Sequence, residues 1–222
     1  MTRLRLVASA PGGPNVAELG TMAPERLPPG RHGLPANLVR THQRQRLLEA
    51  ASTALGEQGY GRLTAARLTE LAGVSSRTFY QHFEDLWACL LAAYETEAGF
   101  LCAQIEDACE AIEPQDRLSR ARVGIGAAID FLAGEPAVAR LLSAEPPPQI
   151  VPLAAARRDL TERLGTMLRQ VLGPGGATPL PGLERRLIGA AMALVSARAA
   201  EGDPERLREL EPELCELLLA SL

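Results

Sequence analysis

Six polar side chains between residues 76 and 82 could hydrogen-bond to the edge of a DNA base or to a phosphate. Phe79 and Phe83 are four residues apart, so in a helix they share one side and leave the polar residues on the other. An arginine can pair with the O6 and N7 atoms of guanine, a glutamine with adenine, and a threonine methyl can meet the thymine methyl. Eight helical residues span ~12 Å, and a major groove of about 12 Å width accepts them. The pattern is therefore compatible with a helix that enters the major groove and presents six hydrogen-bonding side chains to it: Ser76, Arg77, Thr78, Tyr80, Gln81 and His82.

The residues before this segment have the proportions of a helix-turn-helix. Thr64 is a predicted N-cap of a short helix whose Leu68 and Leu71 are expected to face inward. Gly73 allows a tight turn, Val74 is expected to fill the space between the two helices, and Ser75 is the predicted N-cap of the next helix.

The run Leu71-Ala-Gly-Val-Ser-Ser-Arg-Thr-Phe-Tyr-Gln-His-Phe83 resembles the helix-turn-helix core of TetR-type transcriptional regulators. Gln58-Gly59-Tyr60 and Asp85 are also similar in type and spacing, and the specific resemblance covers about residues 40–98. It implies that Thr64 touches a phosphate, and that Tyr80 and His82 hold the DNA backbone. It further implies base or phosphate contacts for Ser76, Arg77, Thr78 and Gln81. The full predicted DNA-binding set is Thr64, Ser75, Ser76, Arg77, Thr78, Tyr80, Gln81 and His82.

The sequence departs from the family pattern where the fourth helix opens. The family usually has a phosphate-binding lysine after the Asp that caps this helix, whereas Leu86 and Trp87 follow Asp85 here. The charge of the whole chain is −4, but residues 1–83 hold ten arginines against five acidic residues, a net charge of +5, and residues 84–222 have a net charge of −9. This asymmetry suggests a polyanion-binding head on an acidic body, with Arg26, Arg31 and Arg40 making up for the missing lysine.

Hydrophobic periodicity predicts helices along the rest of the chain and no strand. The predicted domains are a Pro/Gly-rich disordered arm (1–37), the DNA-binding head (38–84) and a regulatory body (85–222). Beyond Pro114 we expect a fifth helix with an apolar stripe that begins at Leu118, and further helices up to a ninth that starts at Asp203 and restarts or kinks at Pro212. The predicted fold is therefore all-α, with about nine helices.

Catalysis, metal binding and membrane insertion find little support in the sequence. It has no GxSxG, P-loop or HExxH motif and no histidine beyond residue 82, which argues against an enzyme. Apolar runs such as Leu187 to Val195 are shorter than the about twenty residues that cross a bilayer, so we expect a cytoplasmic protein with no membrane partner. We expect no cofactor and no metal site: the cluster Glu106-Asp107-Glu110-Glu113 is predicted to be a solvated face, and Cys89, Cys102, Cys109 and Cys215 to be structural thiols.

Three functional hypotheses follow. The first is a homodimeric repressor that binds a palindromic operator in double-stranded DNA and is released by a small-molecule effector. The second is a DNA-binding structural protein or activator without an effector, and the third is an enzyme whose head merely resembles the motif. Dimerisation is expected through the eighth and ninth helices, although the same leucines could complete the core of one chain: Leu187, Leu194, Leu214 and Leu218.

Overall fold

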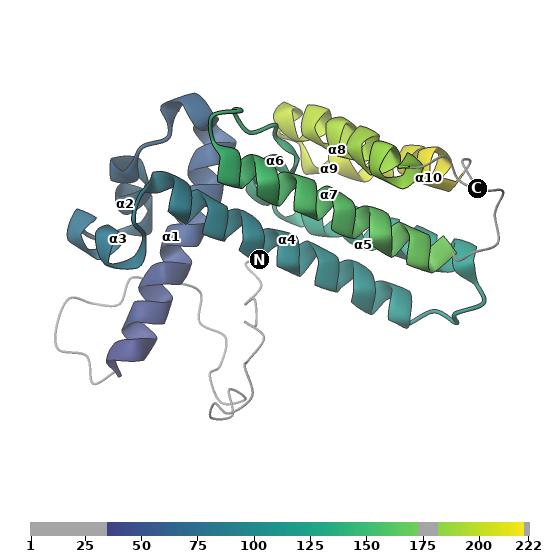
Figure 1. Cartoon of the computed structure of the whole chain (residues 1–222), viewed down its shortest axis with the longest axis horizontal. Helices are drawn as coiled ribbons and strands as arrows, with labels where there is room; N and C mark the ends of the chain where they lie inside the picture. Colours follow the sequence, from purple (N-terminus) through teal and green to yellow (C-terminus); the bar gives the residue numbers. More distant parts are fainter. Residues whose placement is uncertain (1–34, 173–181, 220–222) are drawn as a thin grey trace. The chain divides into compact units, whose positions relative to one another are not determined.

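The computed structural model describes residues 35–172 and 182–219, and the chain divides into two units, Met1–His42 and Gln43–Leu222. The described residues form ten α-helices and one short 3-10 turn, without a strand, which confirms the all-α prediction (Figure 1). The predicted arm up to residue 34, with Arg26 and Arg31, and the segment 173–181 lie outside the described residues.

Four elements make up the predicted head. They are α1 (Ala36–Gln58), the 3-10 turn η2 (Tyr60–Arg62), α2 (Ala65–Ala72) and α3 (Ser76–His82). The predicted N-caps are confirmed, because the side chain of Thr64 accepts a hydrogen bond from the Arg67 amide and that of Ser75 accepts one from the Thr78 amide. Arg40, which was expected to help the arm bind DNA, is an exposed residue of α1.

Seven helices follow. Asp85 caps the long fourth helix, as predicted. The last predicted helix is interrupted, as expected, but the break lies at Glu209 and not at Pro212. Pro212 falls in the first turn of the helix after the break, where its missing amide costs no hydrogen bond. The seven are α4 (Leu86–Glu110), α5 (Arg117–Gly134), α6 (Pro136–Ser143), α7 (Val151–Leu172), α8 (Leu183–Glu201), α9 (Pro204–Arg208) and α10 (Leu210–Leu219).

One hydrophobic core runs from the second half of α1 to α10 and is continuous through α4. Two residues expected to face inward do not belong to it. Leu71 is 36% exposed, because Leu68 and Ala72, one turn apart, already form the inner face of α2. Leu118, in the first turn of α5, is 53% exposed, and the buried stripe of that helix begins at Ala121.

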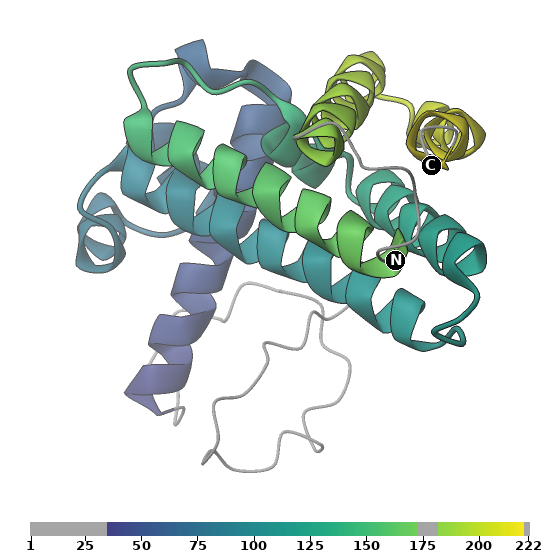
Figure 2. The ribbon, with the colours of Figure 1, turned by 45° about the vertical axis from the view of Figure 1, so that its right-hand side comes forward.

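Helix α4 contacts several other helices of the body, and Figure 2 shows α7 lying alongside it. Within the described residues α4 is the one helix long and apolar enough to cross a membrane by length and composition. It also packs against α5, α6 and α7, and its buried residues, such as Leu90, Tyr94 and Leu101, belong to the common core. Its apolar composition is therefore that of a core helix.

Candidate nucleic-acid interface and internal cavity

The turn between α2 and α3 has the geometry expected of a helix-turn-helix. Gly73 adopts a left-handed conformation with φ 59°, and its amide donates to the carbonyls of Thr69 and Glu70. The Val74 amide donates to the Thr69 carbonyl at 3.0 Å, and the half-buried Val74 side chain packs against the core. The Ser75 hydroxyl then lies 2.9 Å from the Thr78 hydroxyl, so the start of α3 is fixed by two side chains as well as by backbone bonds.

Helix α3 presents a polar outer face. Ser75, Ser76, Arg77 and Gln81 are exposed, Tyr80 is 62% exposed, and Thr78 and His82 are half-buried. No ion pair among the described residues involves Arg77. Thr64 is exposed at the N-terminus of α2. The fold therefore leaves the predicted DNA-binding side chains on or close to the surface of one motif.

The inner side of α3 is solid apolar packing. Phe79 is fully buried and Phe83 nearly so, with ring centroids 5.9 Å apart, which confirms both as core residues. The ring centroids of Tyr80 and Phe79 are 5.2 Å apart in a T-shaped arrangement, while the guanidinium of Arg44 lies 5.1 Å from the centre of the Phe83 ring. Sequence reasoning did not single out Arg44, because a lone arginine on α1 gives no sign of which ring it will cover.

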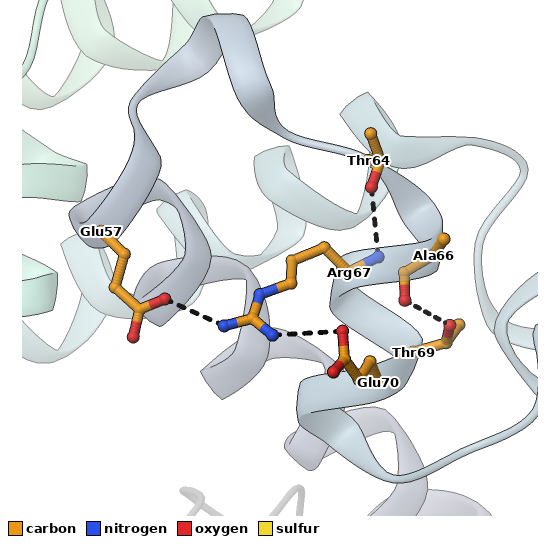
Figure 3. A network of polar contacts seen from close by, with 6 residues as sticks. All are labelled: Glu57, Thr64, Ala66, Arg67, Thr69 and Glu70. Carbon is orange, nitrogen blue, oxygen red and sulfur yellow. Dashed lines mark hydrogen bonds and ion pairs between the residues drawn. The ribbon is translucent and has the colours of Figure 1, made fainter.

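Arg67 joins α2 to the end of α1 (Figure 3). Its guanidinium donates to Glu57 at 3.3 Å and to Glu70 at 3.1 Å, while its amide is the donor to Thr64. Such surface ion pairs are individually weak. The pair with Glu57 connects residues ten positions apart, so it restricts the angle between α2 and the end of α1. The i,i+3 spacing of Arg67 and Glu70 was visible in the sequence, whereas the contact with Glu57 depends on the fold.

The helical body contains a partly open cavity of about 400 Å³, which lies within the range of about 300–1,000 Å³ found for ligand pockets. Helices α4 to α8 and α10 supply its wall. Sequence reasoning could not identify these residues, because aliphatic side chains that line a cavity look the same as those that fill a core. The wall is mainly aliphatic and includes Leu101, Ile105, Ile125, Leu132, Leu164, Met167, Ile188 and Met192.

A few polar side chains also line this cavity: Glu106, Glu110, Arg120, Ser143 and Gln170. Two of them are already engaged, because Arg120 Nε donates to the Cys109 carbonyl at 3.2 Å and Ser143 Oγ donates to the Ala139 carbonyl at 2.6 Å. The four carboxylate residues of the predicted solvated face are exposed. No group of His, Cys, Asp and Glu in the described residues could hold a metal ion.

The four cysteines are free thiols, as expected, and three of them are buried. The Cys89 Sγ donates to the Leu47 carbonyl at 3.7 Å, and burial raises the pKa of this thiol to about 12. Burial also raises the pKa of Cys109, whose Sγ donates to the Arg120 carbonyl. Cys215 is half-buried. Protonated thiols of this kind are poor nucleophiles.

The predicted dimerisation residues fall into different environments. Leu187 and Leu194 are half-buried on α8, whereas Leu214 of α10 is only 4% exposed within one chain and lines the cavity. Leu218 lies in α10. The outer side of α8 carries exposed alanines at helical spacing: Ala190, Ala193, Ala197 and Ala200.

Comparison with known proteins bears on the same segment as the motif. Residues 47–93 match the family model of the bacterial regulatory proteins of the tetR family. The chain is a TetR-family transcriptional regulator. This family consists of regulators that bind DNA through the helix-turn-helix and not of enzymes, in agreement with the sequence-based expectation.

Solved structures extend the similarity of this TetR-family chain to the body. The fatty acid degradation regulator FadR from Bacillus halodurans superposes with a TM-score of 0.68 at 18% identity, over 80% of this chain and 98% of its own. FadR from Bacillus subtilis in complex with stearoyl-CoA gives 0.67 at 17% identity over the same shares. A TetR-like regulator from Rhodococcus sp. RHA1 gives 0.66 at 17%, over 84% and 98%. These likenesses show a shared fold, and no curated protein matches the chain by sequence.

Proposed function

We propose that this TetR-family regulator is a homodimeric repressor that binds a palindromic operator through α3 and leaves it when a small, largely apolar effector fills the body. The observation that carries the proposal is the combination of an exposed polar α3 with a separate apolar cavity of about 400 Å³. In this proposal residues 38–84 act as the DNA-binding head and residues 85–222 as the regulatory body.

The side chains of α3 support sequence-specific binding. Arg77 is exposed and makes no ion pair among the described residues, so it reaches a guanine without first breaking a bond. Gln81, one turn later, lies on the same face and suits adenine. Four further side chains flank Arg77 and Gln81 and are suited to bind phosphates: Thr64, Ser75, Tyr80 and His82. Contacts with phosphates position a protein on DNA without specifying a sequence.

A homodimer is supported by the outer side of α8. Its exposed alanines at positions 190, 193, 197 and 200 let a second helix approach closely, and the half-buried Leu187 and Leu194 border them. Leu214 contributes to this arrangement from inside the protomer, by supporting α10 against the cavity. Two heads must lie about 34 Å apart, or a multiple of it, to enter successive major grooves.

The apolar cavity favours a repressor with an effector over an effector-free DNA-binding protein. FadR from Bacillus subtilis, which shares the fold, has been solved with stearoyl-CoA, so long-chain acyl compounds are the first effectors to test. Because α4 begins at the end of the head and its second half lines the cavity, a ligand that moves α4 changes the head spacing. A ligand shifts that equilibrium only by its differential affinity for the two spacings.

The decisive experiment selects duplexes from a random DNA pool with the wild-type protein, in the absence and presence of stearoyl-CoA. We expect a palindromic site, a dimer in sedimentation, and weaker binding with the acyl-CoA present. Trp87, the only tryptophan, lies half-buried at the start of α4, and its fluorescence should report both DNA and ligand. If stearoyl-CoA binds free protein and the DNA complex equally well, release by this effector is wrong, because linkage requires a reciprocal effect.

A further inference from the structure

Arg140, on α6, hydrogen-bonds to the ends of two other helices. Its Nε donates to the carbonyl of Ala199, in the last turn of α8, at 2.9 Å. Its Nη1 donates to the carbonyl of Gly56, in the last turn of α1. The last carbonyls of a helix have no partner within the helix and carry the negative end of its dipole, so a cation is favourable at both places.

A glycine stands at each of the two helix ends, and the one at the end of α1 makes room for this contact. A Cβ at Gly56 would lie 3.2 Å from the Cα of Ala137, so α1 and α6 approach as closely as they do because Gly56 has no side chain. Gly202 ends α8 with φ 81°, and its amide also donates to the Ala199 carbonyl. A Cβ on Gly202 would lie 3.5 Å from Nη2 of Arg140. The guanidinium is therefore fitted between two helix ends.

The neighbours of Arg140 along α6 face elsewhere. Ala139, Leu142 and Ser143 line the cavity, while Val138 and Leu141 are buried in the core. Helix α6 is thus in contact with the cavity, with the end of α1 in the head and with the end of α8 on the proposed dimer side. Arg140 is the residue that hydrogen-bonds across all three helices.

We infer that Arg140 is a positioning residue that fixes the DNA-binding head to α8 and so sets the distance between the two α3 helices of the dimer. The inference rests on the proposed dimeric DNA-binding function. The rigid fork of a guanidinium can hold two acceptors in fixed directions, whereas a lysine ammonium on a flexible stem cannot hold both carbonyls in this geometry. Losing the bond therefore loosens the spacing of the heads and leaves α3 itself unchanged.

The test is a spacing profile. Duplexes carry two copies of the half-site selected by the wild-type protein, separated by increasing numbers of base pairs, and a further duplex carries one half-site. We expect the wild type to bind strongly at one narrow spacing, because two linked contacts gain about 10²–10⁴-fold over one. Arg140→Met and Arg140→Lys should lose at least about 10-fold at that spacing and give a flattened profile, as avidity disappears when geometry is not maintained.

Two controls separate this role from general destabilisation. Arg158→Met removes an exposed arginine of α7 and should keep the wild-type profile. Both Arg140 variants should bind the single half-site within about 2-fold of wild type, since distant sites act independently. A narrow wild-type profile in Arg140→Lys overturns the inference, as does an equal loss on the single half-site, which would mean that the head itself is damaged. If the wild type shows no preferred spacing, the proposed dimeric function fails instead.

Discussion

The head and the body of this chain use their interiors in opposite ways. In the head, Phe79 and Phe83 fill the space beneath α3, and the residues suited to DNA are all on the outside. In the body, aliphatic side chains surround a space of about 400 Å³ that they do not fill. A filled interior holds a surface in one shape, whereas a hollow one can respond to what enters it. In the proposed function, DNA recognition therefore belongs to the filled head and regulation to the hollow body.

The largest expected effect on stability comes from removing a buried aromatic ring from the core of the head. Phe79→Ala removes a fully buried ring and should lower the free energy of unfolding by about 3–5 kcal/mol, measured by denaturant titration. Its neighbour Tyr80 is 62% exposed, and Tyr80→Ala should change stability by no more than about 0.5 kcal/mol. DNA binding should be weakened in both. Equal stabilities for the two variants would contradict a solid core beneath α3.

A substitution on the outer face should affect recognition and spare stability. Arg77→Ala should weaken binding to the best site by about 1–3 kcal/mol and relax the preference at one base position. Tyr80→Phe should weaken binding to all sequences alike, because phosphate contacts carry no sequence information. Binding of each variant to a library of single-base operator variants distinguishes the two. A uniform loss for Arg77→Ala would make this residue a phosphate contact.

The same Ala→Leu substitution should change the free energy of unfolding in opposite directions in the head and in the body. Ala72→Leu, in the buried inner face of α2, should destabilise the protein by about 1–3 kcal/mol through overpacking. Ala128→Leu, on the cavity wall, has space to enter and should be neutral or stabilise by about 0.5–2 kcal/mol. Thermal unfolding measures both. Ala128→Leu should also weaken binding of stearoyl-CoA. If Ala128→Leu destabilises the protein instead, the cavity wall cannot accept additional side-chain atoms.

A further prediction concerns pH and two titratable side chains, Cys89 in the first half of α4 and Tyr60 in η2. Burial raises the pKa of Cys89 from 9.0 and that of Tyr60 from 10.0, each to about 12. Because both pKa values are higher in the folded protein, the contribution of Cys89 is complete below pH 9 and that of Tyr60 below pH 10, and both are lost as pH rises towards 12. Stability should fall by about 1 kcal/mol per pH unit and per group in that window. Cys89→Ala should make the fall between pH 9 and 10 shallower, and an unchanged slope would exclude this thiol as a cause.

The same contrast explains what could be predicted from the sequence. The caps Thr64, Ser75 and Asp85, and the turn at Gly73, depend on neighbours within four residues, and all were predicted correctly. Leu71 and Leu118 were placed wrongly, since periodicity alone does not say where an apolar stripe ends.

Long-range features could not be predicted. The contact of Arg140 with Gly56 joins residues 84 positions apart, and the cavity wall is drawn from six helices. Arginines at positions 44, 67 and 140 look alike in the sequence, and only the fold shows that one covers a ring, one joins α2 to α1 and one holds two helix ends.

The length of α4 has a consequence for how such a protein can evolve. Its first turn, from Leu86, packs at the head, and its first residue on the cavity wall is Leu101, fifteen residues or ~22 Å further along the axis. In the proposed function, mutations that reshape the cavity therefore lie far from those that alter base preference. Descendants of one ancestor can acquire new effectors while keeping an old operator, or the reverse. A single helix thus allows natural selection to change two specificities one at a time.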